Sequence, residues 1–148
     1  MASYRFTARA KAPPELVFDL WTNLDRMAEW VGGVTAVTEL SGPIDHAGTT
    51  YVTHFGRMKS PTQVLEAKRP SRFVTRFGNW LLRGENATVF APDGDGTRIT
   101  EEFRTRGVIS ALSALFFASG SYRGSFQGEL NEFVRIIDRE VQAGERGK

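Results

Sequence analysis

The C-terminal stretch, residues 121–142, constrains the fold more than any other part of the chain. Its apolar residues recur at spacings of three and four, which predicts a long helix with one apolar stripe: Tyr122, Phe126, Leu130, Phe133, Val134, Ile137 and Val141. Charged residues such as Glu129 and Arg135 fall on its other faces. Because nearly everything between residue 34 and this helix alternates with the period of strands, we expect the apolar stripe to cover a sheet.

Seven segments read as strands: 3–11, 34–40, 49–56, 61–68, 71–79, 83–91 and 97–106. Turn-forming residues separate several of them, and such short links favour antiparallel hairpins. Pro13-Pro14-Glu15 predicts the start of a helix, and a second short helix is expected from Asp25 to Val31, with Asn23 as its N-cap and Gly32-Gly33 at its end.

The expected fold is therefore α+β. A curved antiparallel sheet of about seven strands wraps around the long C-terminal helix, and two short helices follow the first strand. We expect one domain over residues 1–148, with residues 143–148 as a disordered tail.

Composition excludes several classes of function. Lys plus Arg number 19 against 17 Asp plus Glu, and no basic cluster alternates with aromatic residues, so we expect no nucleic-acid partner. The absence of cysteine excludes disulfides and thiolate chemistry. His46 and His54 are too few and too far apart for a metal site, so no metal or cofactor is expected. The start of the chain lacks a signal-peptide pattern and no apolar run reaches the roughly 20 residues of a membrane span, so we expect a cytoplasmic protein without stable membrane insertion.

The stretch from Ala12 to Trp30, APPELVFDLWTNLDRMAEW, resembles the opening of the START-like (SRPBCC, helix-grip) superfamily, and is closest to bacterial polyketide cyclase/dehydrase-type proteins. That opening is a strand, a helix that begins with proline and an acid, and a short acidic turn that leads to a tryptophan, here Trp30. The resemblance implies a cavity between the sheet and the long helix that accepts an apolar molecule. The alternative is that the aromatic side chains simply fill this space.

Alternation along the strands predicts which side chains face inward, and Glu101 would then be a carboxylate on an apolar face. Such a group needs a partner or a raised pKa, and both are common at functional sites. A bulge that turns Glu101 outward is the structural alternative. Ala87 and Ala91 share the predicted inward set with the expected ligand-lining residues, which are Trp30, Tyr51, Thr53, Phe55, Phe73, Thr75, Phe77, Val89, Ile99, Glu101, Phe103, Tyr122, Phe126, Leu130 and Phe133. Arg76, Arg98 and Glu102 are expected on the outer face.

Three further segments allow a structural or a functional interpretation. The Phe116-Phe117 segment reads as a packed turn, or as a mobile lid or membrane-touching surface. Gly124 and Gly128 leave room for a close neighbour, so a homodimer is possible through this face or through Phe116-Phe117. Asp93-Gly94-Asp95-Gly96 has Arg104 where a calcium loop needs Glu, and therefore predicts a hairpin turn.

The expected function is binding of a small hydrophobic or amphipathic molecule, such as a lipid, a polyketide or an isoprenoid. The first alternative is a cyclase/dehydratase-type enzyme, in which Glu101 serves as acid or base and Tyr51 assists. The second alternative is a protein-interaction module. Glu101 is the one clear polar candidate among the inward positions, and this favours binding over catalysis.

Overall fold

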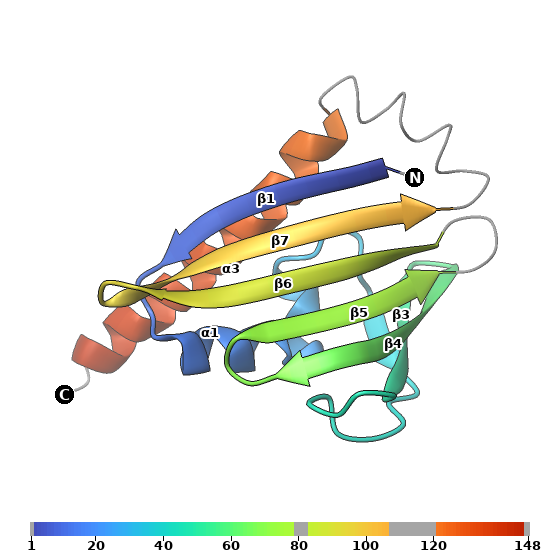
Figure 1. The fold of residues 1–148 in the computed structure, drawn as a ribbon, viewed down its shortest axis with the longest axis horizontal. Coiled ribbons are helices and arrows are strands. Elements are labelled where there is room, and N and C mark those ends of the chain that lie inside the picture. Colours follow the sequence, from blue (N-terminus) through green and yellow to red (C-terminus); the bar gives the residue numbers. More distant parts are fainter. Residues whose placement is uncertain (1, 79–82, 107–120, 147–148) are drawn as a thin grey trace.

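The computed structural model describes residues 2–78, 83–106 and 121–146. Its strands are β1 Ala2–Ala10, β2 Ala36–Thr38, β3 Thr50–Phe55, β4 Met58–Lys68, β5 Arg72–Gly78, β6 Arg83–Asp93 and β7 Gly96–Arg106. They form one seven-stranded sheet in the order β1-β7-β6-β5-β4-β3-β2, and every neighbouring pair is antiparallel. The long C-terminal helix α3, Ser121–Arg146, crosses one face of this sheet (Figure 1). The predicted helix-grip architecture is confirmed.

Two short helical elements follow β1, as predicted. Helix α1, Pro14–Trp21, begins with proline in its first turn, where no backbone donor is needed, and buries Val17, Phe18 and Leu20. The second element is a 3₁₀ helix, η1, Leu24–Glu29. Asn23 occupies its N-cap position but makes no capping hydrogen bond through its side chain, so the predicted capping interaction is wrong.

Helix α3 is longer than the sequence pattern predicts. It continues through Arg146, so residues 143–146 are helical and do not belong to a disordered tail. The predicted stripe faces the sheet: Leu130, Phe133 and Ile137 are buried, and Phe126, Val134 and Val141 pack against the core at its border. No helix of the described ranges is long and apolar enough to cross a membrane.

Polar contacts fix α3 to the chain that precedes the second strand. The Asp138 carboxylate accepts a hydrogen bond from the Lys11 backbone at 2.8 Å, and the Gln127 side-chain amide donates to the Thr7 carbonyl at 3.0 Å. Near the middle of the helix, the Gly32 backbone donates to the Glu129 carboxylate at 2.9 Å. These contacts fix the position of α3 on the sheet, and therefore which of its side chains meet which strands.

The strand register defines the inner face of the sheet, which is the face toward α3. Ala8, Phe6 and Tyr4 of β1 lie opposite Ile99, Glu101 and Phe103 of β7, and these in turn lie opposite Phe90, Thr88 and Asn86 of β6. On β5, Phe73, Thr75 and Phe77 continue the same rows. The hairpin between β6 and β7 pairs Asp93 with Gly96, which confirms the predicted turn.

The predicted inward face of β6 is wrong. Thr88 and Phe90 are the buried residues, with 0% and 2% exposure, so Ala87, Val89 and Ala91 lie on the outer face. Because successive side chains of a strand alternate, a shift of one residue exchanges the two faces. Val89 therefore does not line the space under α3. Arg76, Arg98 and Glu102 lie on the outer face as predicted.

Candidate functional site

The end of the inner face next to α1 is filled by aromatic rings. Phe133 of α3 packs edge-on against Trp21 and Trp30, with ring centroids 5.0 and 5.1 Å apart. Phe18 makes similar contacts with Phe73 and Phe90. Rings in such T-shaped arrangements attract one another in addition to burying apolar area. This end is therefore a packed core.

Several residues predicted to line a cavity belong to that packed core. Ile99, Leu130 and Phe133 have 0–1% exposure, and Trp30 and Phe73 have 5%. A side chain without accessible surface offers no contact to a ligand unless the surrounding packing opens. In this structure these five residues pack in the core, and Ile99, Leu130 and Phe133 have almost no accessible surface for the predicted contact with a ligand. The ligand contacts predicted for Trp30 and Phe73 stay a prediction.

The other end of the inner face carries a looser row of phenylalanines. Phe77 stacks on Phe103 at 5.2 Å, Phe103 lies 5.0 Å from Phe126 of α3, and Phe126 lies 5.9 Å from Phe6. Phe77, Phe103 and Phe126 are all partly exposed. Gly84 makes this arrangement possible, because a Cβ at that position would lie 2.6 Å from the Phe77 ring. Apolar surface thus remains accessible beside the packed core.

Glu101 points inward from the middle of β7, as predicted. It keeps regular register with Phe6 on one side and Thr88 on the other, which excludes the alternative of a local bulge. Its exposure is 7%. The Asn86 side chain donates a hydrogen bond to Glu101 Oε1 at 2.7 Å, and the Thr88 hydroxyl donates to Asn86 Oδ1 at 2.9 Å. A short polar chain on β6 therefore holds one carboxylate oxygen.

Burial raises the pKa of Glu101 to about 7, although the Asn86 hydrogen bond opposes this shift and the Glu129 charge reinforces it. Burial also raises the pKa of Glu129, which is half-buried on α3, and its hydrogen bond from Gly32 opposes that shift. Both effects follow from the cost of holding a charge away from water. The two carboxylates interact across the interface between the sheet and the helix.

Some inward polar atoms have no partner among the described residues. No hydrogen bond is formed by the Thr75 hydroxyl or the Tyr51 hydroxyl, although the two residues are only 8% and 5% exposed, and none is formed by Glu101 Oε2. Within the same part of the chain, every side-chain nitrogen or oxygen that is sealed from solvent does have a partner. These three atoms therefore border accessible space on the inner face.

Tyr51 and Glu101 are not brought together through the sheet. Tyr51 lies on β3, and three strands separate it from β7. Burial raises the pKa of the Tyr51 hydroxyl above its ordinary value, so this group stays protonated. Thr53 is buried on the same strand and Phe55 is half-buried, both facing inward as predicted.

Sequence reasoning missed three polar residues of this site. The inward orientation of Asn86 and Thr88 is not predicted, because the alternation pattern assigns their apolar neighbours on β6 to the interior. The helical pattern places Glu129 on a face other than the apolar stripe, yet it is half-buried and its carboxylate accepts a hydrogen bond from the Gly32 backbone. A usable signal was present, since Asn86 and Thr88 are two residues apart on the strand that pairs with the strand of Glu101.

Some predicted positions remain untested. The side chain of Tyr122, the Phe116-Phe117 segment and the surroundings of Gly124 lie outside the described residues. Gly128 is exposed, and a Cβ at this position would meet no atom within 4 Å. Homodimerisation through this face stays a prediction.

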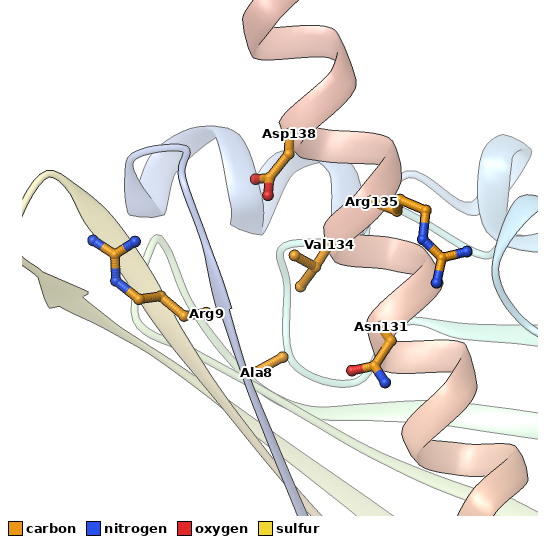
Figure 2. A pocket seen from close by; sticks show the side chains of 6 residues that line it. All are labelled: Ala8, Arg9, Asn131, Val134, Arg135 and Asp138. Carbon is orange, nitrogen blue, oxygen red and sulfur yellow. The ribbon is translucent and has the colours of Figure 1, made fainter.

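A separate groove lies at the sheet edge, between β1 and α3. It has a volume of about 320 Å³ and is lined by Ala8, Arg9, Asn131, Val134, Arg135 and Asp138. Figure 2 shows Arg9 and Arg135 pointing away from each other on opposite sides of the groove. Their charges are paired elsewhere, Arg9 with Asp93 and Asp95 and Arg135 with Glu132. The groove thus presents a small apolar floor and two arginines that are already ion-paired, while the Asp138 carboxylate accepts a hydrogen bond from the Lys11 backbone.

The sheet with α3 across its inner face defines a helix-grip protein of the START-like superfamily. A family model described as polyketide cyclase/dehydrase and lipid transport matches residues 1–138. The chain belongs to this family.

Solved structures show the same fold at low sequence identity. A conserved protein from Geobacillus kaustophilus is 14% identical with a TM-score of 0.73, covering 93% of this chain and 96% of its own. A protein from Thermobifida fusca is 18% identical with a TM-score of 0.73, covering 94% and 95%. DynU16, a protein of the dynemicin biosynthetic locus, is 18% identical with a TM-score of 0.63; the match covers 96% of this chain but 48% of DynU16. No curated protein sequence matches the chain.

Proposed function

We propose that this protein binds a small hydrophobic or amphipathic molecule between the sheet and α3, at the end of the inner face where Phe77, Phe103 and Phe126 lie. The observation that carries the proposal is the set of unpartnered polar atoms beside these partly exposed rings: the Thr75 hydroxyl, the Tyr51 hydroxyl and Glu101 Oε2. The family description, which names lipid transport together with cyclases and dehydrases, supports it.

The arrangement is costly for a protein that binds nothing. Aromatic rings that stay partly exposed lose the stabilisation that burial would give, and the three polar atoms have no hydrogen-bond partner within the described protein. A bound amphipathic molecule covers the rings and supplies hydrogen bonds to the polar atoms at once. Small-molecule binding sites in proteins commonly have this composition, with mainly apolar walls and a few well-placed polar groups.

Titration with the neutral dye Nile red tests the proposal, because its fluorescence reports transfer from water into an apolar site. We expect saturable binding of one dye per chain. Thr75→Phe places a ring in the proposed site and is expected to weaken dye binding at least tenfold. Thr100→Phe is the matched control, because Thr100 faces outward on β7 between inward Ile99 and Glu101.

Circular dichroism of both variants checks that the fold is retained. The proposal is wrong if the native protein shows no saturable dye binding. It is also wrong if folded Thr75→Phe and Thr100→Phe bind the dye equally well.

One observation favours an enzymatic function as the second candidate. A carboxyl group with a pKa of about 7 is suited to exchange protons near neutral pH. Glu101 would be the acid or base, without Tyr51, which lies three strands away. Loss of turnover in Glu101→Gln with intact Nile red binding would support catalysis, whereas unchanged turnover of an identified substrate would exclude this role for Glu101.

A further inference from the structure

The charges on the inner face have one sign. Among the strand positions that the structure describes, every Lys and Arg lies on the outer face or at its border, and Glu101 is the charged residue that points inward. Helix α3 adds Glu129, which is half-buried and electrostatically coupled to Glu101. An anionic molecule placed between them would meet two like charges in a poorly solvated space.

The hydrogen bonds of Glu101 leave one acceptor free. Asn86 donates to Oε1, and the Asn86 side chain is itself held by Thr88. Oε2 has no partner among the described residues. The Thr75 hydroxyl, which also has no partner among the described residues, lies on β5 directly opposite Asn86. A ligand group that satisfies the ionised Glu101 Oε2 therefore has to donate a hydrogen bond, whereas the Thr75 hydroxyl can either donate to a ligand or accept from it.

Aromatic rings surround the same carboxylate. Phe6 lies opposite Glu101 on β1, and Phe103 is its next inward neighbour on β7. Phe126 of α3 joins these two, with centroid distances of 5.9 Å to Phe6 and 5.0 Å to Phe103. The faces of aromatic rings carry negative potential and attract cations, and an ammonium group offers up to three hydrogen-bond donors. The carboxylate and the rings both favour a positively charged donor.

We infer that the ligand of this site is a hydrophobic amine. Its ammonium group binds Glu101 Oε2 beside the side chains of Phe6, Phe103 and Phe126, and its apolar part lies along Phe77. This inference rests on the proposed function and narrows its ligand class. It distinguishes the protein from a carrier of fatty acids or other anionic lipids.

Competition by three molecules with the same ten-carbon chain tests the inference. Decylamine, decanol and decanoate are each used to displace Nile red at pH 8. We expect decylamine to displace the dye at a concentration at least tenfold lower than decanol, and decanoate to be the weakest. Glu101→Gln keeps the shape of the side chain and is expected to remove the advantage of decylamine while decanol competes as before.

Glu102→Gln is the matched control, because Glu102 is the next residue of β7 and points outward. We expect it to behave like the native protein. A second test needs no variant: at pH 5 Glu101 is protonated, so the advantage of decylamine over decanol should shrink. The groups that face Glu101 are Phe6 from β1, Asn86 and Thr88 from β6 and Glu129 from α3, and Glu129 loses charge in the same direction.

The outcomes separate the two proposals. If decanol competes but decylamine has no advantage, or if decanoate competes equally well, the inference is overturned and the proposed function stands. An amine preference that persists in folded Glu101→Gln also overturns the inference. If none of the three displaces the dye and the dye itself does not bind, the proposed function fails.

Discussion

Glu101 combines a regular strand position with an unusual environment for a carboxylate. The register of β1, β7 and β6 forces it inward, and Asn86 supplies one hydrogen bond where a surface carboxylate would have several water molecules. Since burial opposes ionisation more than this bond favours it, the pKa rises to about 7.

The raised pKa predicts how stability depends on pH. Between the ordinary pKa of glutamic acid and about 7, native Glu101 holds a proton that the unfolded chain has released, so the free energy of unfolding falls as pH rises through this window. The loss contributed by Glu101 is roughly 3 kcal/mol and is complete above the native pKa. Urea unfolding at pH 5 and pH 8 should show a smaller loss for Glu101→Gln than for the native protein.

Glu102→Gln serves as the comparison, because it removes a carboxylate from the outer face of the same strand. It should keep the pH dependence of the native protein. Equal pH dependence in Glu101→Gln and Glu102→Gln would contradict the burial of an uncompensated carboxyl at position 101.

The sequence predicts only part of the surroundings of Glu101. Alternation along β7 is sufficient to place Glu101 inward. The partnership with Asn86 is not predictable in the same way, because it depends on which residues of β6 lie opposite β7. The burial of Glu129 depends on a contact with Gly32, which is remote in sequence. Local patterns do not encode contacts over such separations.

Helix α3 contacts the sheet in two different ways along its length, one at each end of the described contact. Phe133 is fully buried between Trp21 and Trp30, whereas Phe126 is partly exposed above Phe6 and Phe103. Removing a ring from a sealed core leaves a cavity, whereas removing a partly exposed ring leaves less unfilled space.

We predict different consequences for the two rings. Phe133→Ala should lower the free energy of unfolding by about 3–5 kcal/mol. Phe126→Ala should cost clearly less stability but weaken Nile red binding by several-fold, since it removes part of the proposed site. Urea denaturation and dye titration of both variants measure these effects. The division of α3 into two parts is wrong if the variants lose equal stability and Phe126→Ala binds the dye normally.

The elements themselves follow closely from periodicity, but the orientation of one strand does not. Each of the seven predicted strands and three predicted helical elements has a counterpart in the structure, although β2 covers only residues 36–38 of the predicted 34–40 and β4 begins at Met58, before the predicted residue 61. On β6, however, small apolar residues occupy the outer face and Thr88 and Asn86 the inner one. Hydrophobicity assigns the wrong face in such a strand, because the interior it meets is itself polar around Glu101.

For the whole molecule, the fold places a sealed core and an accessible polar and aromatic region under the same helix. Phe18 and Trp21 of α1, and Trp30 directly after η1, fill one end of the inner face with packed rings. Pairing of the first strand with the last brings Phe6 to Glu101 across most of the chain length. The sequence pattern predicts the sheet and its helix, but this pairing, which completes the surroundings of Glu101, appears only in the folded chain.

A crystal structure of the protein with decylamine tests the central claim most directly. We predict one molecule on the inner face, with its ammonium nitrogen within hydrogen-bond distance of Glu101 Oε2 and its chain against Phe77 and Phe103, while Trp21, Trp30 and Phe133 keep their packing. A molecule found only in the edge groove at Ala8 and Val134, or inserted among the rings of the packed core, would contradict the account.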